Sequence, residues 1–219
     1  MITSSLKIFL ALIGSLWLLI SFTRCGENLE NEKMPFGGTT IKVQDIPIEG
    51  FSKKEQEALT AAIEFLARDT QSYEKIGRPI EYVKKHVTKF LWHASSAAPG
   101  GNSEAAAIFY PNGRYVVIND SINDVMVQAF AAILLHEAAH DVYGGHDCDG
   151  NKDKTGEKTF GIEIRYMAAR AIDPNPDPLL TCMDRDILYQ VAMNRERWWI
   201  CNDPKVNVQS NYPQPQCSK

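Results

Sequence analysis

The feature that most constrains the fold is a strongly apolar segment, from about Ile122 to Tyr143, that carries ionisable side chains in its second half. Asn119-Asp120-Ser121 offers helix-capping side chains before this segment, and Gly144-Gly145 follows it. These signals predict one long helix with a buried apolar surface. Histidine and glutamate side chains in such a helix are costly to bury without a partner. We therefore expect a core helix whose ionisable side chains share a ligand.

The ionisable side chains of this helix follow the pattern His136-Glu137-Ala138-Ala139-His140. Histidines four residues apart project from one helix face, so both imidazoles can bind the same ion, and Glu137 lies at the edge of that face. Zinc with three protein ligands keeps a fourth position for water, whose pKa it lowers to about 7. We therefore predict a zinc ion (Zn2+) as the cofactor, with His136 and His140 as ligands and Glu137 as the general base.

Two residues are candidates for the third metal ligand. His146 lies six residues after His140, and Gly144-Gly145 allow the chain to leave the helix and return the imidazole to the ion. Glu163 lies 23 residues after His140, where it can be a ligand, a partner that orients a ligand imidazole, or an ordinary surface charge. The return assisted by glycine is the more specific feature, so we predict His146, with Glu163 as the alternative.

The HExxH pattern followed by DVYGGH resembles the metzincin signature HExxHxxGxxH. Tyr143 stands at the glycine position of that signature, and the glycines come one and two residues later. The spacing of Glu163 is similar instead to the gluzincin pattern. The resemblance to zinc-dependent peptidases covers Ile133 to Tyr166, and the methionine turn of metzincins would fall at Met183.

This resemblance implies a zincin-like α+β domain, mostly helical, with a small antiparallel sheet or hairpin beside the active-site helix. It also implies a peptide or protein substrate that pairs with a strand above the helix. We assign that strand to the segment from Arg114 to Ile118. The alternative is an ordinary hairpin strand that only stabilises the sheet.

Periodicity and turn residues predict the other elements. Ser52 and Glu55 form a capping box at the start of one helix, and the apolar stripe of the next helix runs from Ile80 to Leu91. The segment from Ser95 to Ser103 is expected to be a loop. The remaining expectations are a strand from Thr39 to Val43, a hairpin of Ala107 to Tyr110 and Arg114 to Ile118, and helices from Phe160 to Ala171 and from Asp184 to about Trp199.

The loop before the helix at Phe160 is rich in acidic residues. Asp147, Asp149, Asn151 and Asp153 alternate as at the start of a calcium-binding loop. The sixth and twelfth positions of that motif are lysines here, where calcium loops have glycine and glutamate. We therefore expect a solvated loop.

The N-terminus has the layout of an export signal, with Lys7 before an apolar run from Ile8 to Phe22. The run is shorter than the ~20 residues that cross a bilayer, which favours a cleaved signal peptide over residues 1–24. Cys25 resembles the lipid-acceptor cysteine of a bacterial lipoprotein, although Phe22 and Arg24 depart from the usual lipobox. A lipid on Cys25 or an uncleaved N-terminal segment would attach the protein to a membrane.

Residues 25–50 are expected to form a tether that can include a first strand, and residues 51–219 a single domain. Beyond Cys25, the cysteines form an even set that allows two disulfides in three pairings: Cys148, Cys182, Cys201 and Cys217. Disulfides require an oxidising compartment. We therefore predict an exported protein that is periplasmic, anchored to the membrane of the cell envelope, or secreted.

The formal net charge of −4 and the lack of a basic stripe give no indication of nucleic-acid binding.

The leading hypothesis is a zinc-dependent hydrolase, specifically a peptidase of the cell envelope. The first alternative is a non-catalytic envelope lipoprotein whose structural zinc site adds Cys148 as a fourth ligand. A second alternative is an envelope binding protein in which the HExxH pattern is incidental.

Overall fold

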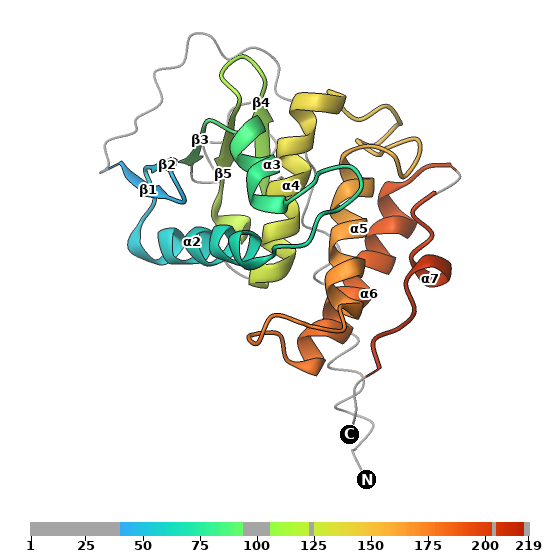
Figure 1. Ribbon diagram of the computed structural model, residues 1–219. Helices are drawn as coiled ribbons and strands as arrows, with labels where there is room; N and C mark the ends of the chain where they lie inside the picture. Colours follow the sequence, from blue (N-terminus) through green and yellow to red (C-terminus); the bar gives the residue numbers. More distant parts are fainter. Residues whose placement is uncertain (1–39, 94–105, 123–124, 203–204, 217–219) are drawn as a thin grey trace, which may run out of the picture.

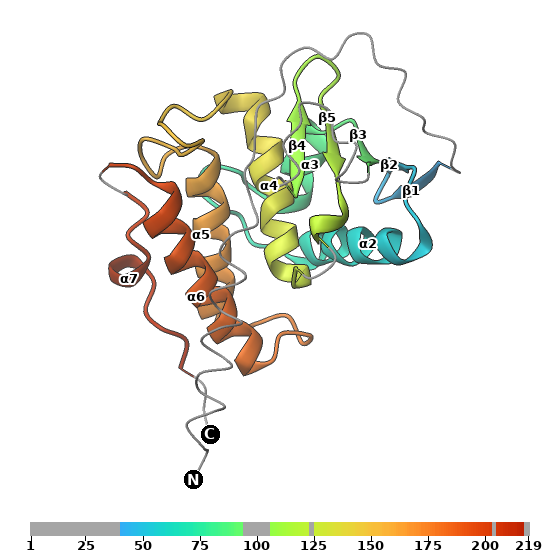
Figure 2. The same cartoon turned by 180° about the vertical axis from the view of Figure 1, so that it is seen from behind.

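A computed structural model describes residues 40–93, 106–122, 125–202 and 205–216. These residues form helices packed on a small sheet (Figures 1 and 2), so the predicted α+β class is confirmed. The export signal, Cys25 and the loop expected from Ser95 to Ser103 lie outside the described residues. Within them, no helix has the length and apolar character needed to cross a membrane.

The strands are β1 (Ile41–Val43), β2 (Ile46–Glu49), β3 (Lys89–Trp92), β4 (Ala107–Tyr110) and β5 (Tyr115–Ile118). The α-helices are α2 (Lys53–Arg68), α3 (Pro79–His86), α4 (Val127–Tyr143), α5 (Thr159–Ile172), α6 (Cys182–Trp199) and α7 (Val208–Asn211). A short 3-10 helix, η3 (Asp120–Ile122), precedes α4.

The five strands lie in the order β1-β2-β3-β5-β4. The predicted hairpin is present as β4 and β5, which pair antiparallel. β3 pairs in parallel with both β2 and β5, so the sheet is mixed and not purely antiparallel. β5 is hydrogen-bonded on both sides, so the expectation that the segment from Arg114 to Ile118 offers an open edge to a substrate is wrong. Among the described strands, β4 occupies the edge next to β5.

α4 runs through the centre of the molecule, between the sheet and α5 (Figure 1). Its residues from Ala129 to His140 are all buried, as the apolar sequence predicts. The helix begins at Val127, later than expected, and Asp120 and Ser121, which we expected to cap it, form the separate turn η3 with Ile122. It ends where Gly144 adopts a positive φ of 69° and donates its N–H to the carbonyl of His140. Glycine adopts that conformation without steric cost.

The predicted helix that begins at Pro79 is shorter than its apolar stripe suggests. α3 ends at His86, and Val87 is extended and donates its N–H to the carbonyl of Val83. Phe90 and Leu91, which we placed on the helix, lie in β3, where Phe90 pairs with Val116 of β5. β-branched Val87 and Thr88 favour extended backbone, and pairing with β5 decides between the two structures.

α5 and α6 pack against each other on the side of α4 away from the sheet (Figure 2). α6 begins with a capping box in which Thr181 and Asp184 exchange hydrogen bonds, two residues before the predicted start of the helix. A disulfide joins Cys148, in the loop after α4, to Cys201, just after α6, and Cys182 is also disulfide-bonded. The predicted use of these cysteines in disulfides is therefore confirmed for the Cys148–Cys201 pair.

Candidate metal centre

Three histidine side chains meet at the C-terminal end of α4. His136 and His140 lie one turn apart on the helix, and His146 follows the chain reversal at Gly144 and Gly145. Each ring offers one nitrogen atom to the group, and these atoms lie within 4.8 Å of one another. His136 is 0% exposed and His140 is 3% exposed. The structure therefore brings together the three residues that we predicted as metal ligands.

The Nδ1 atoms of the two helical histidines face oxygen acceptors. His136 Nδ1 lies 2.9 Å from Oε2 of Glu163, which α5 presents to the centre. His140 Nδ1 lies 2.6 Å from the carbonyl oxygen of Gly144, so the turn that ends α4 also orients this ring. An imidazole whose Nδ1–H is held by an oxygen presents the lone pair of Nε2 to a metal. For His136 the contact with Glu163 lacks hydrogen-bond geometry, so it places Glu163 beside this imidazole and outside the group of three donors.

The carboxylate of Asp153 accepts a hydrogen bond from the ring of His146. Its carboxylate is 0% exposed, and Oδ1 lies 2.8 Å from Nδ1 of His146. The other oxygen accepts the backbone N–H of Phe160 at 2.8 Å and the hydroxyl of Thr159 at 3.2 Å. Asp153 thus joins the third histidine to the first turn of α5, where a negative charge is favourable. The expectation of a solvated loop is wrong for this residue.

The surroundings of His136 and His140 disfavour the protonated form of their imidazole rings. Burial, followed by the positive charge of a protonated His136, lowers the pKa of His140 to about 3. Burial also lowers the pKa of His136. Nε2 of His140 is buried and has no hydrogen-bond partner among the described residues. A zinc ion would satisfy this atom, and three neutral imidazoles are a ligand set used by catalytic zinc sites, so the residues fit the predicted metal.

Glu137 lies beside the histidines and is 0% exposed. Burial and then the negative charge of Glu163 raise the pKa of its carboxyl, and the nearby backbone N–H of Phe109 opposes them, so that the pKa is about 8. Phe109 belongs to β4, and its ring is stacked with His140 at a centroid distance of 6.4 Å. The predicted general base therefore sits between the histidines and the edge strand of the sheet.

Aromatic rings close the other side of the centre. Phe160 contacts His136 edge-on at 4.4 Å between ring centroids and stacks with His146 at 4.8 Å. Trp199, the last residue of α6, stacks on the ring of Phe160, with a distance of 5.1 Å between the ring centroids. These apolar rings lower the local dielectric, which strengthens electrostatic interactions within the site.

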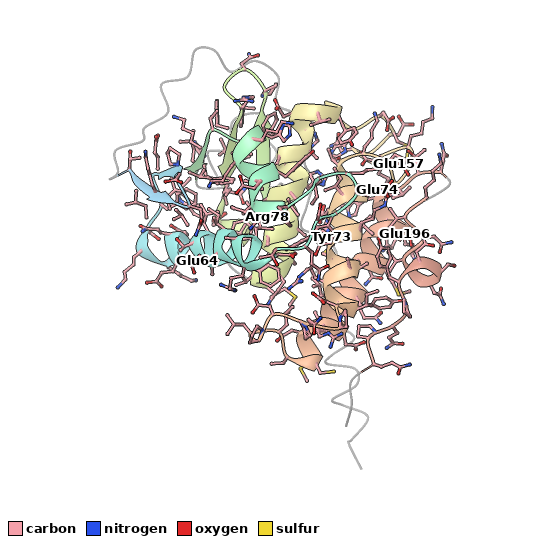
Figure 3. All side chains as sticks on the ribbon, in the orientation of Figure 1. Glu64, Tyr73, Glu74, Arg78, Glu157 and Glu196 are labelled. Atoms are coloured by element: carbon pink, nitrogen blue, oxygen red, sulfur yellow. A yellow bond between two sulfur atoms is a disulfide. The ribbon has the colours of Figure 1, made fainter. Side chains whose placement is uncertain are left out.

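A surface cavity of about 370 Å³ is lined in part by residues of α5. Tyr73 and Glu74, labelled in Figure 3, line it together with Arg165 and Tyr212. None of the three histidines lines this cavity. It is therefore separate from the metal centre.

Two residues of the centre were missed by the sequence analysis. Asp153 was visible only as part of an acidic alternation, and Arg195, whose Nε lies 3.2 Å from Oε1 of Glu163, gave no sequence signal at all. Met183, where the resemblance placed the methionine turn, is 74% exposed at the start of α6 and does not lie beneath the histidines.

No protein-family model, no curated protein and no solved structure matches the chain.

Proposed function

We propose that this protein is a zinc-dependent hydrolase, and specifically a metallopeptidase, that binds its ion through His136, His140 and His146. The observation that carries the proposal is the convergence of three ring nitrogens within 4.8 Å of one another beside a buried glutamate. Three protein ligands leave a coordination position for water, as in catalytic zinc sites, whereas structural sites have four protein ligands.

A zinc ion held by these histidines would supply a Lewis acid that lowers the pKa of water to about 7 and polarises a carbonyl. Glu137 would accept the proton of a water molecule as the water oxygen bonds to the carbonyl carbon of a peptide, and would deliver that proton to the amine nitrogen as the C–N bond breaks. A buried carboxylate next to the histidines is positioned for both transfers. Glu163 and Asp153 keep the rings of His136 and His146 oriented during the reaction.

The edge strand β4 supports a peptide as the substrate. The Asn119 N–H bonds to the carbonyl of Ala106, so alternate residues of this strand face β5 and the main-chain groups of Ala107 and Phe109 face away from it. The backbone N–H of Phe109 lowers the pKa of Glu137, so this side of the strand lies near the proposed base. An extended peptide that adds to such an edge would be positioned by main-chain hydrogen bonds.

The disulfide bears on the non-catalytic alternative and on location. Cys148 was the fourth ligand expected for a closed structural zinc site, but its sulfur is bonded to Cys201 and is not a thiolate. A disulfide of this kind forms in oxidising compartments, which supports an exported protein of the cell envelope. We keep this location as part of the proposal.

The test is the substitution Glu137→Gln in the exported protein. The variant is expected to bind one zinc per chain and to lose at least about a hundredfold of its rate on a fluorogenic peptide library, as expected for loss of a general base. Glu64→Gln, which changes an exposed glutamate of α2 (Figure 3), is the matched control and should leave the rate unchanged. Equal turnover by Glu137→Gln and the wild type would refute the role of Glu137, and a zinc-loaded wild type without hydrolytic activity would refute the enzyme.

A further inference from the structure

The Glu163 carboxylate bridges two charged or ionisable partners. Oε2 lies 2.9 Å from Nδ1 of His136, and Oε1 lies 3.2 Å from Nε of Arg195 on α6. Glu163 is 2% exposed and Arg195 is 16% exposed at the side chain, so this chain of contacts is largely shielded from water. Interactions between charges are much stronger in such surroundings than at a surface.

Arg195 also contacts the aromatic rings that pack beside the histidines. Its guanidinium lies over the ring of Trp199, 5.9 Å from the centroid, one helical turn further along α6. Trp199 stacks on Phe160, which contacts His136. Arg195 is thus connected to His136 by two routes, through the carboxylate of Glu163 and through two aromatic rings.

A buried carboxylate needs a compensating charge. Glu137 and Glu163 are both buried near the histidines, and the negative charge of Glu163 acts unfavourably on that of Glu137. The positive charge of Arg195 beside Oε1 attracts the Glu163 carboxylate and limits the positions that it can adopt. Removing one partner of a buried pair leaves the other uncompensated.

We propose that Arg195 is a positioning residue of the metal centre, which holds the Glu163 carboxylate against the imidazole of His136. The inference rests on the proposed metal centre and adds a third layer to it: His136 binds, Glu163 orients His136, and Arg195 orients Glu163. Partners outside the ligand set typically contribute 10- to 100-fold to metal affinity. Arg195 therefore acts on metal affinity without touching the metal.

The test compares Arg195→Met with Arg185→Met, because both arginines lie on α6 and contact α5 or its C-terminal end. Arg185 donates to the carbonyls of Ala171 and Asp173, and it lies ten residues, or about 15 Å along the helix axis, before Arg195. Zinc affinity is measured by competition with a chromophoric chelator, and the folded state by urea unfolding of the metal-free proteins. We expect about a 10- to 100-fold loss of zinc affinity for Arg195→Met and none for Arg185→Met.

Two further variants separate positioning from general destabilisation. Arg195→Lys keeps the cation and should recover part of the zinc affinity. In the Glu163→Gln background, Arg195→Met should cause little further loss, because Arg195 acts through Glu163. Cobalt(II) in place of zinc should show a changed visible absorption spectrum in Arg195→Met and an unchanged one in Arg185→Met.

Each outcome has a distinct meaning. Equal zinc affinity in the wild type and Arg195→Met would overturn the positioning role, as would an undiminished effect of Arg195→Met in the Glu163→Gln background. A wild-type protein that binds no zinc would refute the metal centre itself. A wild type that binds zinc but hydrolyses nothing would refute the proposed enzyme and leave the role of Arg195 intact.

Discussion

The Cys148–Cys201 disulfide is expected to stabilise both the fold and the position of His146, the proposed third metal ligand. Around it, Asp153 donates its backbone N–H to the carbonyl of Trp199 and accepts the N–H of Cys201, each at 2.9 Å. The disulfide and these two hydrogen bonds attach the loop that follows His146 to the end of α6. Because Asp153 orients His146, loosening this attachment should weaken metal binding as well as the fold.

The magnitude follows from the 53-residue separation of the two cysteines. Opening a loop of that length adds about 14 cal/mol/K of entropy to the unfolded chain, or about 4 kcal/mol at 25 °C. That is a large fraction of the ~5–15 kcal/mol by which domains are stable. The double variant Cys148→Ser, Cys201→Ser should therefore lose about 4 kcal/mol of unfolding free energy in the metal-free state.

The assay is urea unfolding of the metal-free wild type and the double variant without reductant, followed by zinc titration of each. Addition of a dithiol reductant should destabilise the wild type more than the double variant, since Cys148–Cys201 is then opened only in the wild type. A loss below about 1 kcal/mol would refute the chain-entropy argument. A full loss of stability with unchanged zinc affinity would show that the disulfide does not hold His146 through Asp153.

Two further predictions concern the buried carboxylates. Asp153→Asn should weaken zinc binding by about 10- to 100-fold and destabilise the metal-free protein. The reason is that an amide nitrogen would face the N–H of Phe160 or the ring of His146. Asp149→Asn, a substitution of an exposed residue in the same loop, is the control for both measurements. The pKa of Glu137 is about 8 in the folded protein and ordinarily 4.5, so its contribution to stability is present below about pH 4.5 and is lost as the pH rises to 8. In metal-free protein, Glu137→Gln should remove that loss. The unfolding free energy of the variant should therefore rise relative to that of the wild type as the pH increases from 4.5 to 8. A difference between the two proteins that does not change with pH would contradict the burial of an ionisable Glu137.

The sequence was most informative where local signals and burial agree. The apolar segment, the histidine spacing and the glycines after Tyr143 each act within a few residues, so they predict α4, its end and the return of His146 without knowledge of the rest of the fold. The hairpin of β4 and β5 is local for the same reason. Helix and strand could not be separated at Phe90, because an apolar residue near the end of a stripe fits both, and pairing with β5 decides.

The outer residues of the metal centre depend on contacts between distant parts of the chain. Arg195 reaches Glu163 only because α6 packs against α5, and no spacing rule in the sequence relates the two residues. The partner role of Glu163 was one of three interpretations open at the sequence level, and the position of His136 Nδ1 favours it. Asp153 was hidden in a pattern that resembles a calcium loop, and its burial follows from the pairing of this loop with the end of α6.

The most direct test of the central claim is the metal content and ligand identity of the protein, purified without chelators and analysed by elemental analysis and X-ray absorption spectroscopy. The account predicts one zinc ion per chain, bound by three imidazole nitrogens and one oxygen of water, with loss of the ion in a His146→Ala variant. Absence of stoichiometric metal, or an ion saturated by four protein ligands, would contradict it.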